Sequence, residues 1–302
     1  MTDYRAAVIG LGAMGMGMAK SLVAAGIETA GCDLSEDARM SFADAGGRPA
    51  DTPATAAQDA DAVAIVVVNA DQVEAVLTGT DGVLSTLKPG AVVLGCATMP
   101  PETTTSLAAL VSDRGGLYLD APISGGPVKS AAGQLSVMAS GSQDAFDAAK
   151  PLLDAVAEKV FVLGDAPGPG STMKMVNQLL AGVHIASAME AMALAIKSGL
   201  DAETVFEVIT ASAGNSWMFE NRVPHVLEND YSPKSAVDIF IKDLGIVLAQ
   251  GERLDFPLPI SQTAFDRFKQ AKDMGLGRED DASVIKVYQR DSAITLPGEE
   301  KK

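Results

Sequence analysis

A glycine-rich turn near the N-terminus is the feature that most constrains the fold of this 302-residue chain. It lies between an apolar run, Tyr4 to Ile9, and a segment rich in Ala, Met and Leu, Ala13 to Ala25. The turn itself reads Gly10-Leu11-Gly12-Ala13-Met14-Gly15. The apolar run predicts a buried parallel strand, and the segment after the turn predicts a helix. In such a strand–turn–helix unit, the first glycine permits a tight turn, the second lets the backbone approach a pyrophosphate, and the third lets the helix pack closely on the sheet. We therefore expect these six residues to contact a dinucleotide whose phosphates meet the helix N-terminus; the alternative is a glycine-rich turn with no ligand.

An acidic residue follows this turn at the spacing of a ribose contact. A short predicted strand, Ile27 to Cys32, leads to Asp33, eighteen residues after Gly15. A carboxylate accepts a hydrogen bond from a ribose 2′-hydroxyl but repels a 2′-phosphate. The first arginine after it is Arg39, so the sequence favours NAD over NADP as cofactor. Asp33 could instead cap a helix beginning near Glu36, or it could serve both purposes.

Charge and cysteine content exclude several classes of function. The chain carries 23 basic and 39 acidic residues, a net charge of −16, and it has no basic run to contact nucleic-acid phosphates. The two cysteines, Cys32 and Cys96, lack metal-ligand spacing, which favours free thiols in a reducing cytosol. We see no signal peptide and no stretch of membrane-spanning length. We expect a cytoplasmic protein with no metal and with no nucleic-acid or membrane partner.

Short strands and helices alternate over residues 1–165. The continuous apolar run from Ala62 to Val68 is typical of a strand covered on both faces. Further strands are expected at 91–95, 116–121, 135–139 and 160–163, and helices at 35–45, 70–77, 101–113 and 144–155. This alternation predicts an α/β Rossmann domain, a doubly wound parallel sheet with right-handed crossovers. Cofactor contacts are then expected beyond the carboxyl ends of the strands, at Val68, Asn69 and Thr98 and in the loop after Ala121.

A different organisation is predicted for residues 166–302. A Gly- and Pro-rich stretch at 164–170 marks the boundary, and no strand-like alternation follows it. One long helix is expected from Ser171 to Ser198, with Ser171 as its N-cap and Gly199 as its stop. Helices are expected after it at about 201–212, 216–229, 235–254, 259–273 and 281–290. The long helix is apolar almost all round and must be buried on most sides. We therefore expect it to join the Rossmann domain to an all-α substrate and oligomerisation domain, in a homodimer or homotetramer.

A lysine near the start of that long helix is the first candidate for chemistry. A dehydrogenase needs a group that accepts the hydroxyl proton as hydride leaves, and Lys174 could supply it. The positive end of the helix and burial would both lower the pKa of this lysine toward a useful value. Asn177 and Gln178 share its helix face, and either amide could hold the reacting oxygen of a substrate. The alternative is an exposed lysine at a helix end.

Two further groups could recognise a small anionic hydroxy acid. Ser124, Gly125 and Gly126 follow a predicted strand, and their N–H groups could form a nest for a carboxylate, although a tight turn would have the same sequence. Arg222 could also bind a carboxylate, or it could pair with Glu220 or another acidic neighbour.

Two other features in the C-terminal half have structural interpretations. For Trp217 a core position is favoured over a pocket wall. The acidic run Glu279-Asp280-Asp281 is expected to cap the last helix.

Four motifs occur in the order found in the β-hydroxyacid dehydrogenase family. They are Gly10-Leu11-Gly12-Ala13-Met14-Gly15, Asp120-Ala121-Pro122-Ile123-Ser124-Gly125-Gly126, Gly168-Pro169-Gly170-Ser171-Thr172-Met173-Lys174 and Lys242-Asp243. The chain resembles this family, which includes 3-hydroxyisobutyrate dehydrogenase, tartronate semialdehyde reductase and 6-phosphogluconate dehydrogenase, over essentially its whole length. The resemblance implies a Rossmann domain, an all-helical second domain and a lysine general acid/base that matches Lys174. It also implies substrate contacts from Ser124 to Gly126 and cofactor contacts from Thr98 and Lys242.

Two segments narrow the resemblance within the family. Lys174 to His184 and Asn215 to Arg222 are most similar to the L-threonate dehydrogenase subgroup. That subgroup implies NAD-dependent oxidation of a four-carbon sugar acid to a 2-oxo acid, in carbohydrate acid metabolism. The wider family usually has Asn where this chain has Gln178, so whether Asn177 or Gln178 orients the substrate stays open. The alternatives are 3-hydroxyisobutyrate dehydrogenase, tartronate semialdehyde reductase, and a non-catalytic NAD-binding module.

Overall fold

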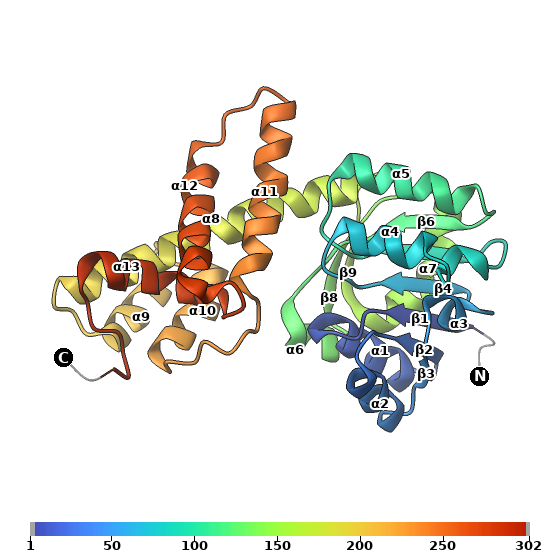
Figure 1. Ribbon diagram of the computed structural model, residues 1–302, viewed down its shortest axis with the longest axis horizontal. Coiled ribbons are helices and arrows are strands. Elements are labelled where there is room, and N and C mark those ends of the chain that lie inside the picture. Colours follow the sequence, from blue (N-terminus) through green and yellow to red (C-terminus); the bar gives the residue numbers. More distant parts are fainter. Residues whose placement is uncertain (1–3, 300–302) are drawn as a thin grey trace. The chain divides into compact units, whose positions relative to one another are not determined.

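A computed structural model describes residues 4–299 of the chain as two compact units (Figure 1). The N-terminal unit ends at Lys174, and the C-terminal unit begins at Met175. The division falls inside the long helix α8 (Pro169–Lys197), whereas the sequence placed the domain boundary just before that helix. Each unit has its own hydrophobic core.

The N-terminal unit is built on a six-stranded parallel sheet with the strand order β3-β2-β1-β4-β5-β6. Its strands are β1 (Arg5–Ile9), β2 (Glu28–Cys32), β3 (Arg48–Ala50), β4 (Ala62–Ile65), β5 (Val92–Gly95) and β6 (Leu117–Asp120). The order reverses direction between β1 and β4, as in a doubly wound Rossmann sheet. The predicted fold class is therefore confirmed.

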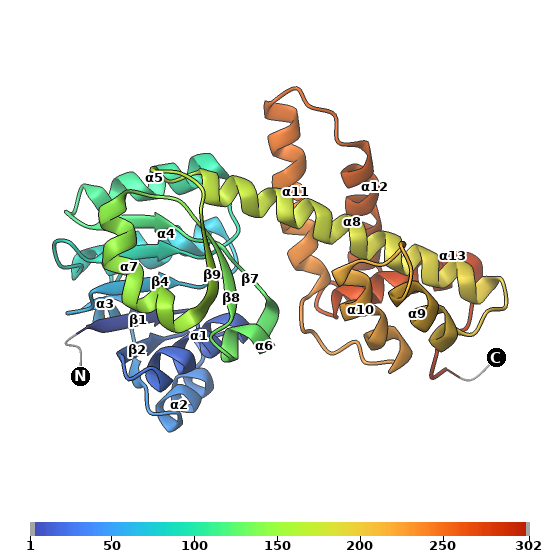
Figure 2. The ribbon, with the colours of Figure 1, turned by 180° about the vertical axis from the view of Figure 1, so that it is seen from behind.

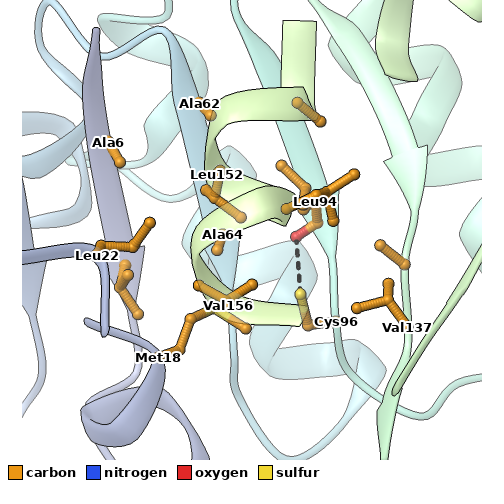
Figure 3. Packing of buried hydrophobic residues seen from close by; sticks show 14 of the residues in the cluster. Ala6, Met18, Leu22, Ala62, Ala64, Leu94, Cys96, Val137, Leu152 and Val156 are labelled. Carbon is orange, nitrogen blue, oxygen red and sulfur yellow. Dashed lines mark hydrogen bonds between the residues drawn. The ribbon is translucent and has the colours of Figure 1, made fainter. Parts of the chain in front are cut away.

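Helices cover both faces of this sheet. Successive side chains of a strand point to opposite faces, so a strand made entirely of apolar residues needs cover on both sides. On β4, Ala62 and Ala64 join one core while Val63 and Ile65 join the other. Figure 3 shows the first core, where Met18, Leu22, Leu152 and Val156 pack over Ala6, Ala62, Ala64 and Leu94. That face is covered by α1 (Ala13–Ala24) and α7 (Gln143–Val156), and residues of α3 (Pro53–Ala57), α4 (Ala70–Thr78) and α5 (Pro101–Ser112) cover the other. The remaining short elements of the unit are α2 (Glu36–Asp44), η1 (Val83–Ser85) and α6 (Gly126–Ala131).

Two of the predicted strands belong to a separate small sheet, which Figure 2 shows from behind. It has the order β7 (Ile123–Ser124), β8 (Leu135–Ala139) and β9 (Ala157–Val162), with β7–β8 antiparallel and β8–β9 parallel. The expectation of one continuous strand series was therefore wrong at this point. Apolar alternation marks a strand but does not say which sheet the strand joins.

The C-terminal unit consists of helices packed around most of α8. They are α9 (Ala202–Thr210), α10 (Trp217–Leu227), α11 (Val237–Arg253), α12 (Pro259–Ala271), η2 (Lys272–Leu276), η3 (Asp281–Val284) and α13 (Ile285–Ser292). Ile185, Met189 and Met192 of α8 are fully buried in its core. The rings of Phe240 and Phe268 stack there with centroids 5.2 Å apart. Residues 163–299 form no β-strand and contain only an isolated β-bridge between Ala236 and Asp280. The all-helical prediction is confirmed for this range.

Helix α8 corrects two expectations from the sequence. By length and composition alone it could cross a membrane, since it has 29 residues and its most apolar window has a mean hydropathy of 1.7. The statement that no stretch reaches this length was therefore wrong. Of that window, 39% is buried inside the protein, so the expectation that the long helix is buried on most sides was wrong for this chain by itself. Ile185, Met189 and Met192 of the helix belong to the C-terminal core, whereas Val176, Leu180 and Leu194 are exposed.

Candidate functional site

The three glycines of the N-terminal turn meet three different environments. Gly10 has φ +94°, and a Cβ there would lie 2.4 Å from the carbonyl oxygen of Val66. A Cβ on Gly15 would lie 1.8 Å from the carbonyl oxygen of Gly10, so the helix packs on the turn without room for a side chain. A Cβ on Gly12 would meet nothing within 4 Å.

This turn leads into the N-terminus of α1, which is open to an anion. Within residues 4–299, no side chain caps α1 at Gly12 and no acidic residue stands in its first turn. The N–H groups and partial positive charge of this helix end therefore suit a pyrophosphate. The residues present fit the dinucleotide that the sequence predicts.

Asp33 is held beside this turn by two backbone hydrogen bonds. Its Oδ2 accepts from the N–H of Leu11 at 2.7 Å, and its Oδ1 accepts from the N–H of Ser35 at 2.8 Å. The cap of α2 is Ser35, whose hydroxyl accepts from the N–H of Ala38, so the alternative that Asp33 caps this helix was wrong. The Asp33 carboxylate is thus fixed at the carboxyl end of β2, in a position suited to a ribose hydroxyl.

The loops after β4 and β5 carry the next expected cofactor contacts. The Asn69 side chain caps α4 by accepting from the N–H of Gln72 at 2.9 Å. The Gln72 side chain in turn accepts from the N–H of Val68 at 2.8 Å, which fixes the Val68–Asn69 turn. Thr98 is half-buried just beyond β5. All three residues lie beyond the carboxyl ends of parallel strands, where ligands bind in such sheets.

The Ser124–Gly126 segment forms the turn between β7 and α6. Gly125 and Gly126 both have positive φ, 132° and 75°, a conformation that L side chains rarely adopt. Their successive N–H groups stand at the start of α6, which no side chain of residues 4–299 caps. Helix α6 is fastened to α1, because the Ser130 hydroxyl donates to the Met14 carbonyl at 2.6 Å. The segment and the dinucleotide turn are therefore held on neighbouring helices of one unit.

Lys174 lies near the start of α8, at the end of the N-terminal unit. Its side chain is buried, with 8% of the residue exposed, so the alternative of an exposed lysine at a helix end was wrong. The helix begins at Pro169, two residues before the predicted cap. Ser171 is not the N-cap, because the carboxylate of Asp120 at the end of β6 takes that role. Asp120 Oδ2 accepts from the N–H of Gly168 at 2.9 Å and from the N–H of Ser171 at 2.8 Å.

Three of the remaining predicted residues, Asn177, Gln178 and Lys242, lie in the C-terminal unit and are joined through Asp243. Asn177 Nδ2 donates to Gln178 Oε1 at 2.9 Å, and Gln178 Nε2 donates to Asp243 Oδ2 at 2.5 Å. The ammonium of Lys242 lies 2.7 Å from Asp243 Oδ1. Sequence reasoning quoted Asp243 only as part of a motif and gave it no role. That Lys242 contacts the cofactor, and which of the two amides orients a substrate, stay predictions.

Arg222 is engaged inside the helical unit. Its Nε lies 2.5 Å from Asp281 Oδ1, its Nη2 lies 3.2 Å from Asp281 Oδ2, and its Nη1 donates to the Asn221 side chain. The acidic neighbour left open by the sequence is therefore Asp281. All three guanidinium nitrogens take part in these contacts, which are structural. That Arg222 also binds a substrate carboxylate stays a prediction.

The structure also tests the expectations for Trp217 and for the acidic run at 279–281. Trp217 is 57% exposed at the start of α10, so the favoured core position was wrong. Asp280 accepts from the N–H of Ala282 and caps η3, which immediately precedes the last helix. The capping role of the acidic run is therefore confirmed for η3, one element earlier than expected.

Each of the two units matches a family model of a nucleotide-binding dehydrogenase domain. Residues 5–164 match the model described as the NAD binding domain of 6-phosphogluconate dehydrogenase. Residues 168–288 match the model described as NAD-binding of NADP-dependent 3-hydroxyisobutyrate dehydrogenase.

Full-length relatives agree with these matches. The chain is 50% identical over 291 residues to L-threonate dehydrogenase of Cupriavidus necator, covering 96% of this chain and 97% of the relative. It is 48% identical over 298 residues to L-threonate dehydrogenase of Escherichia coli K12, covering 98% of each. A crystal structure named 3-hydroxyisobutyrate dehydrogenase from Salmonella typhimurium superposes with a TM-score of 0.91 at 48% identity, covering 94% of this chain and 100% of that one. The chain belongs to the β-hydroxyacid dehydrogenase family, to which 3-hydroxyisobutyrate and 6-phosphogluconate dehydrogenases also belong, and it is an NAD-dependent oxidoreductase.

Proposed function

We propose that this protein oxidises L-threonate to a 2-oxo acid. The observation that carries this substrate is the similarity, at 48–50% identity over nearly the whole chain, to several relatives named L-threonate dehydrogenase. In the reaction the C–H bond and the O–H bond of one alcohol carbon break, and a carbonyl forms. NAD, when bound, would supply the hydride acceptor, and the protein must accept the proton.

We assign the roles in the N-terminal unit as follows. The glycine turn and Asp33 hold the pyrophosphate and the ribose of the cofactor. The Ser124 hydroxyl and the N–H groups of Gly125 and Gly126 hold the substrate carboxylate. The amine of Lys174, in its neutral form, takes the hydroxyl proton as hydride leaves. Beyond Lys174 on α8, in the C-terminal unit, we assign to Asn177 or Gln178 the role of orienting the reacting oxygen.

A second candidate substrate is 3-hydroxyisobutyrate. The observation that favours it is the name of the Salmonella structure, which is as similar to this chain as the Escherichia coli L-threonate dehydrogenase is. The two acids differ in size and in the number of hydroxyl groups. A site that hydrogen-bonds the extra hydroxyls of a sugar acid discriminates strongly against an acid that lacks them.

A panel of acids separates these candidates. The protein would be assayed for formation of reduced cofactor, with NAD and with NADP. The acids tested would be L-threonate, 3-hydroxyisobutyrate, L-serine and glycerate, the product that a tartronate semialdehyde reductase forms. We expect kcat/KM for L-threonate with NAD to exceed every other pair by about tenfold or more. A higher value for 3-hydroxyisobutyrate would replace the first candidate with the second. NAD binding without turnover of any acid would contradict both and point to a non-catalytic NAD-binding module.

We also propose that the protein is a cytoplasmic homodimer or homotetramer. Several large apolar side chains are exposed on α8 and around the turn between α11 and α12: Val176, Leu180, Leu194, Leu254, Phe256 and Ile260. Exposed large apolar side chains of this kind are often found at subunit interfaces. Both cysteines are free and buried, which suits a reducing compartment.

A further inference from the structure

A buried polar cluster holds the start of α8 against the ends of β6 and β8. We call it the α8 anchor, and it consists of Asp120, Ser140, Gly168, Gly170, Ser171 and Thr104, whose hydroxyl lies 3.0 Å from the Ser171 hydroxyl. Besides the two N–H groups already described, Asp120 accepts the Ser171 hydroxyl at 2.7 Å and the Ser140 hydroxyl at 3.2 Å. The Ser140 hydroxyl accepts the N–H of Gly170 at 2.9 Å.

The α8 anchor satisfies the helix start completely. Pro169 has no N–H, Gly170 bonds to Ser140, Ser171 bonds to Asp120, and the N–H of Thr172 bonds to the Gly168 carbonyl at 2.9 Å. Helix starts usually leave such donors to nearby residues or to water. Here a carboxylate from a strand end supplies the cap, so the helix start is tied to the sheet. The side chains of Asp120, Ser140 and Thr104 are fully buried.

Close packing adds to these hydrogen bonds. A Cβ on Gly170 would lie 2.5 Å from the Met138 carbonyl oxygen, 2.8 Å from the Asp120 carbonyl oxygen and 2.9 Å from Asp120 Oδ2. No side chain fits at this position without moving the helix. Hydrogen bonds and close contact together therefore fix where the first turn of α8 lies, and Lys174 follows Ser171 by one helical turn.

The carboxylate also changes the electrostatics of the helix start. An uncapped helix N-terminus carries about half a positive charge, which would disfavour the ammonium form of a lysine in the next turn. An ionised carboxylate placed on that N-terminus offsets this charge. Burial raises the pKa of Asp120, and the hydrogen bonds that it accepts from Ser171, Gly168 and Ser140 act in the opposite direction. The other titratable groups coupled to Asp120 are Tyr118 on β6 and Cys96 after β5. Burial raises the pKa of Cys96 to about 12 and also raises the pKa of Tyr118, so both groups are neutral in an ordinary assay.

We propose that Asp120 is a positioning residue for Lys174: it fixes the helix turn that carries the amine, and its charge tunes how tightly that amine holds a proton. The proposal rests on the proposed function, in which Lys174 accepts the hydroxyl proton. It assigns Asp120 no contact with substrate or cofactor.

The Asp120→Asn variant separates the charge from the geometry. The amide oxygen can still accept from the N–H groups of Gly168 and Ser171, and its NH₂ can donate to the Ser171 hydroxyl, which is able to turn and accept. With the negative charge gone, the Lys174 ammonium is less stable and the amine loses its proton at lower pH. We expect the acid limb of the kcat/KM profile for oxidation to move down by about 0.5 pH unit, with little change in maximal kcat.

The Asp120→Ala variant removes the anchor as well as the charge. It leaves the N–H groups of Gly168 and Ser171 buried without an acceptor. We expect kcat to fall about tenfold or more, because a small displacement of a catalytic group is costly, while KM for NAD changes less than about threefold. Should this variant fail to fold, Ser171→Ala removes only the hydroxyl contact and should lower kcat by a few fold with the same split between kcat and KM.

Asp61→Asn is a matched control. Asp61 immediately precedes β4, at the amino ends of the strands, whereas Asp120 lies at the carboxyl end of β6. Asp61 accepts from the N–H of Arg5 at 2.8 Å and pairs with Lys88 at 2.6 Å. This variant should leave the pH profile unmoved. An unmoved profile in Asp120→Asn, together with undiminished kcat in Asp120→Ala and Ser171→Ala, would show that the α8 anchor serves folding only.

Lys174→Ala belongs in the same series. Activity retained in that variant would overturn the proposed function itself. Loss of activity there, beside wild-type behaviour in the Asp120 variants, would overturn only the role of Asp120.

Discussion

Glycines at Gly10, Gly12 and Gly15 serve different purposes, and the atoms around each one show which. At Gly15 a methyl group would overlap the Gly10 carbonyl, whereas at Gly12 it would enter open space. Gly12 also has φ −71°, an angle open to any residue. The two positions therefore separate the needs of the fold from the needs of the ligand.

We predict opposite effects for alanine at these two positions. Gly15→Ala should lower the free energy of unfolding by about 2 kcal/mol or more, because α1 must move away from the turn. Gly12→Ala should leave it within about 0.5 kcal/mol and weaken NAD binding about tenfold, because its methyl group meets the approaching pyrophosphate. Urea unfolding and titration calorimetry measure the two effects. A Gly15→Ala protein as stable as the wild type would contradict the packing argument.

Asp33 carries the prediction about cofactor choice. Replacing Asp33 by Ser removes the carboxylate that accepts the ribose hydroxyl and repels a 2′-phosphate. We expect kcat/KM for NAD to fall about tenfold and the preference for NAD over NADP to shrink by more than that. Steady-state kinetics with both cofactors at one fixed acid concentration would measure this change. An unchanged ratio would mean that Asp33 does not face the ribose.

Residues that act through local spacing could be predicted from the sequence, and residues that act through distant partners could not. The glycine turn and Asp33 are close together in the chain, so the ligand they suit followed from their spacing. Ser171 had the local signature of a helix cap, but the cap is Asp120, from 51 residues earlier in the chain. The role of Asp243 was missed for the same reason, since its contact with Gln178 spans 65 residues.

At the scale of elements, a buried ion pair and a buried histidine–aspartate hydrogen bond join α10 to η3 and its N-cap, Asp280. Arg222 pairs with Asp281, and His225 Nδ1 lies 2.9 Å from Asp280 Oδ1. Burial raises the pKa of Asp281 to about 6, against the opposing charge of Arg222. Burial acts on Asp280 in the same direction, but its hydrogen bonds to His225 and to the N–H of Ala282 hold its pKa below the usual range.

The raised pKa of Asp281 predicts a pH-dependent stability. The folded protein holds this proton more tightly than the unfolded chain, whose aspartates have a pKa of about 3.9. The free energy of unfolding should therefore fall as pH rises from about 4 to about 6, by at most about 3 kcal/mol from this group, and then level off. Asp280 acts in the opposite sense, giving stability that is lost as pH falls below about 4.

Comparison with Asp281→Asn isolates this contribution. Urea unfolding of both proteins would be measured at several pH values between 4 and 7. The unfolding free energy of the wild type minus that of the variant should fall by up to about 3 kcal/mol as pH rises from about 4 to about 6, because only the wild type loses a proton at this position. A difference that stays constant across the window would contradict the raised pKa.

Periodicity predicted the longer elements well and their assembly less well. The strands near 62–68 and 91–95 were found because a continuous apolar run requires cover on both faces. β3 and β7 were missed because they have three and two residues, too few for any period to appear. The place of β8 and β9 in a second sheet depends on pairings between distant segments, which a local pattern does not contain.

At the scale of the whole molecule, exposed apolar side chains at the turn between α11 and α12 predict association. Leu254, Phe256 and Ile260 are each more than 60% exposed there. We expect light scattering to give a mass of two or four times the 31.0 kDa chain. Phe256→Glu combined with Ile260→Glu should shift the mass toward that of one chain, because charge is costly to bury at an interface.

Met40→Glu serves as the control for this prediction. Met40 is an exposed apolar side chain on α2 of the N-terminal unit, and its replacement should leave the mass unchanged. A wild-type protein that runs as a single chain at micromolar concentration would contradict the predicted oligomer.

The most direct test of the central claim is turnover by Lys174→Ala on the best acid of the panel, with NAD binding measured on the same preparation. We expect kcat to fall about 100-fold or more, since no other group is assigned to take the hydroxyl proton. The Kd for NAD should stay within about threefold of wild type, because the glycine turn and Asp33 are untouched. Lys174→Arg should be equally slow, because a guanidinium stays protonated and cannot act as the base. Turnover by Lys174→Ala at the wild-type rate would contradict the assignment of this amine as the proton acceptor.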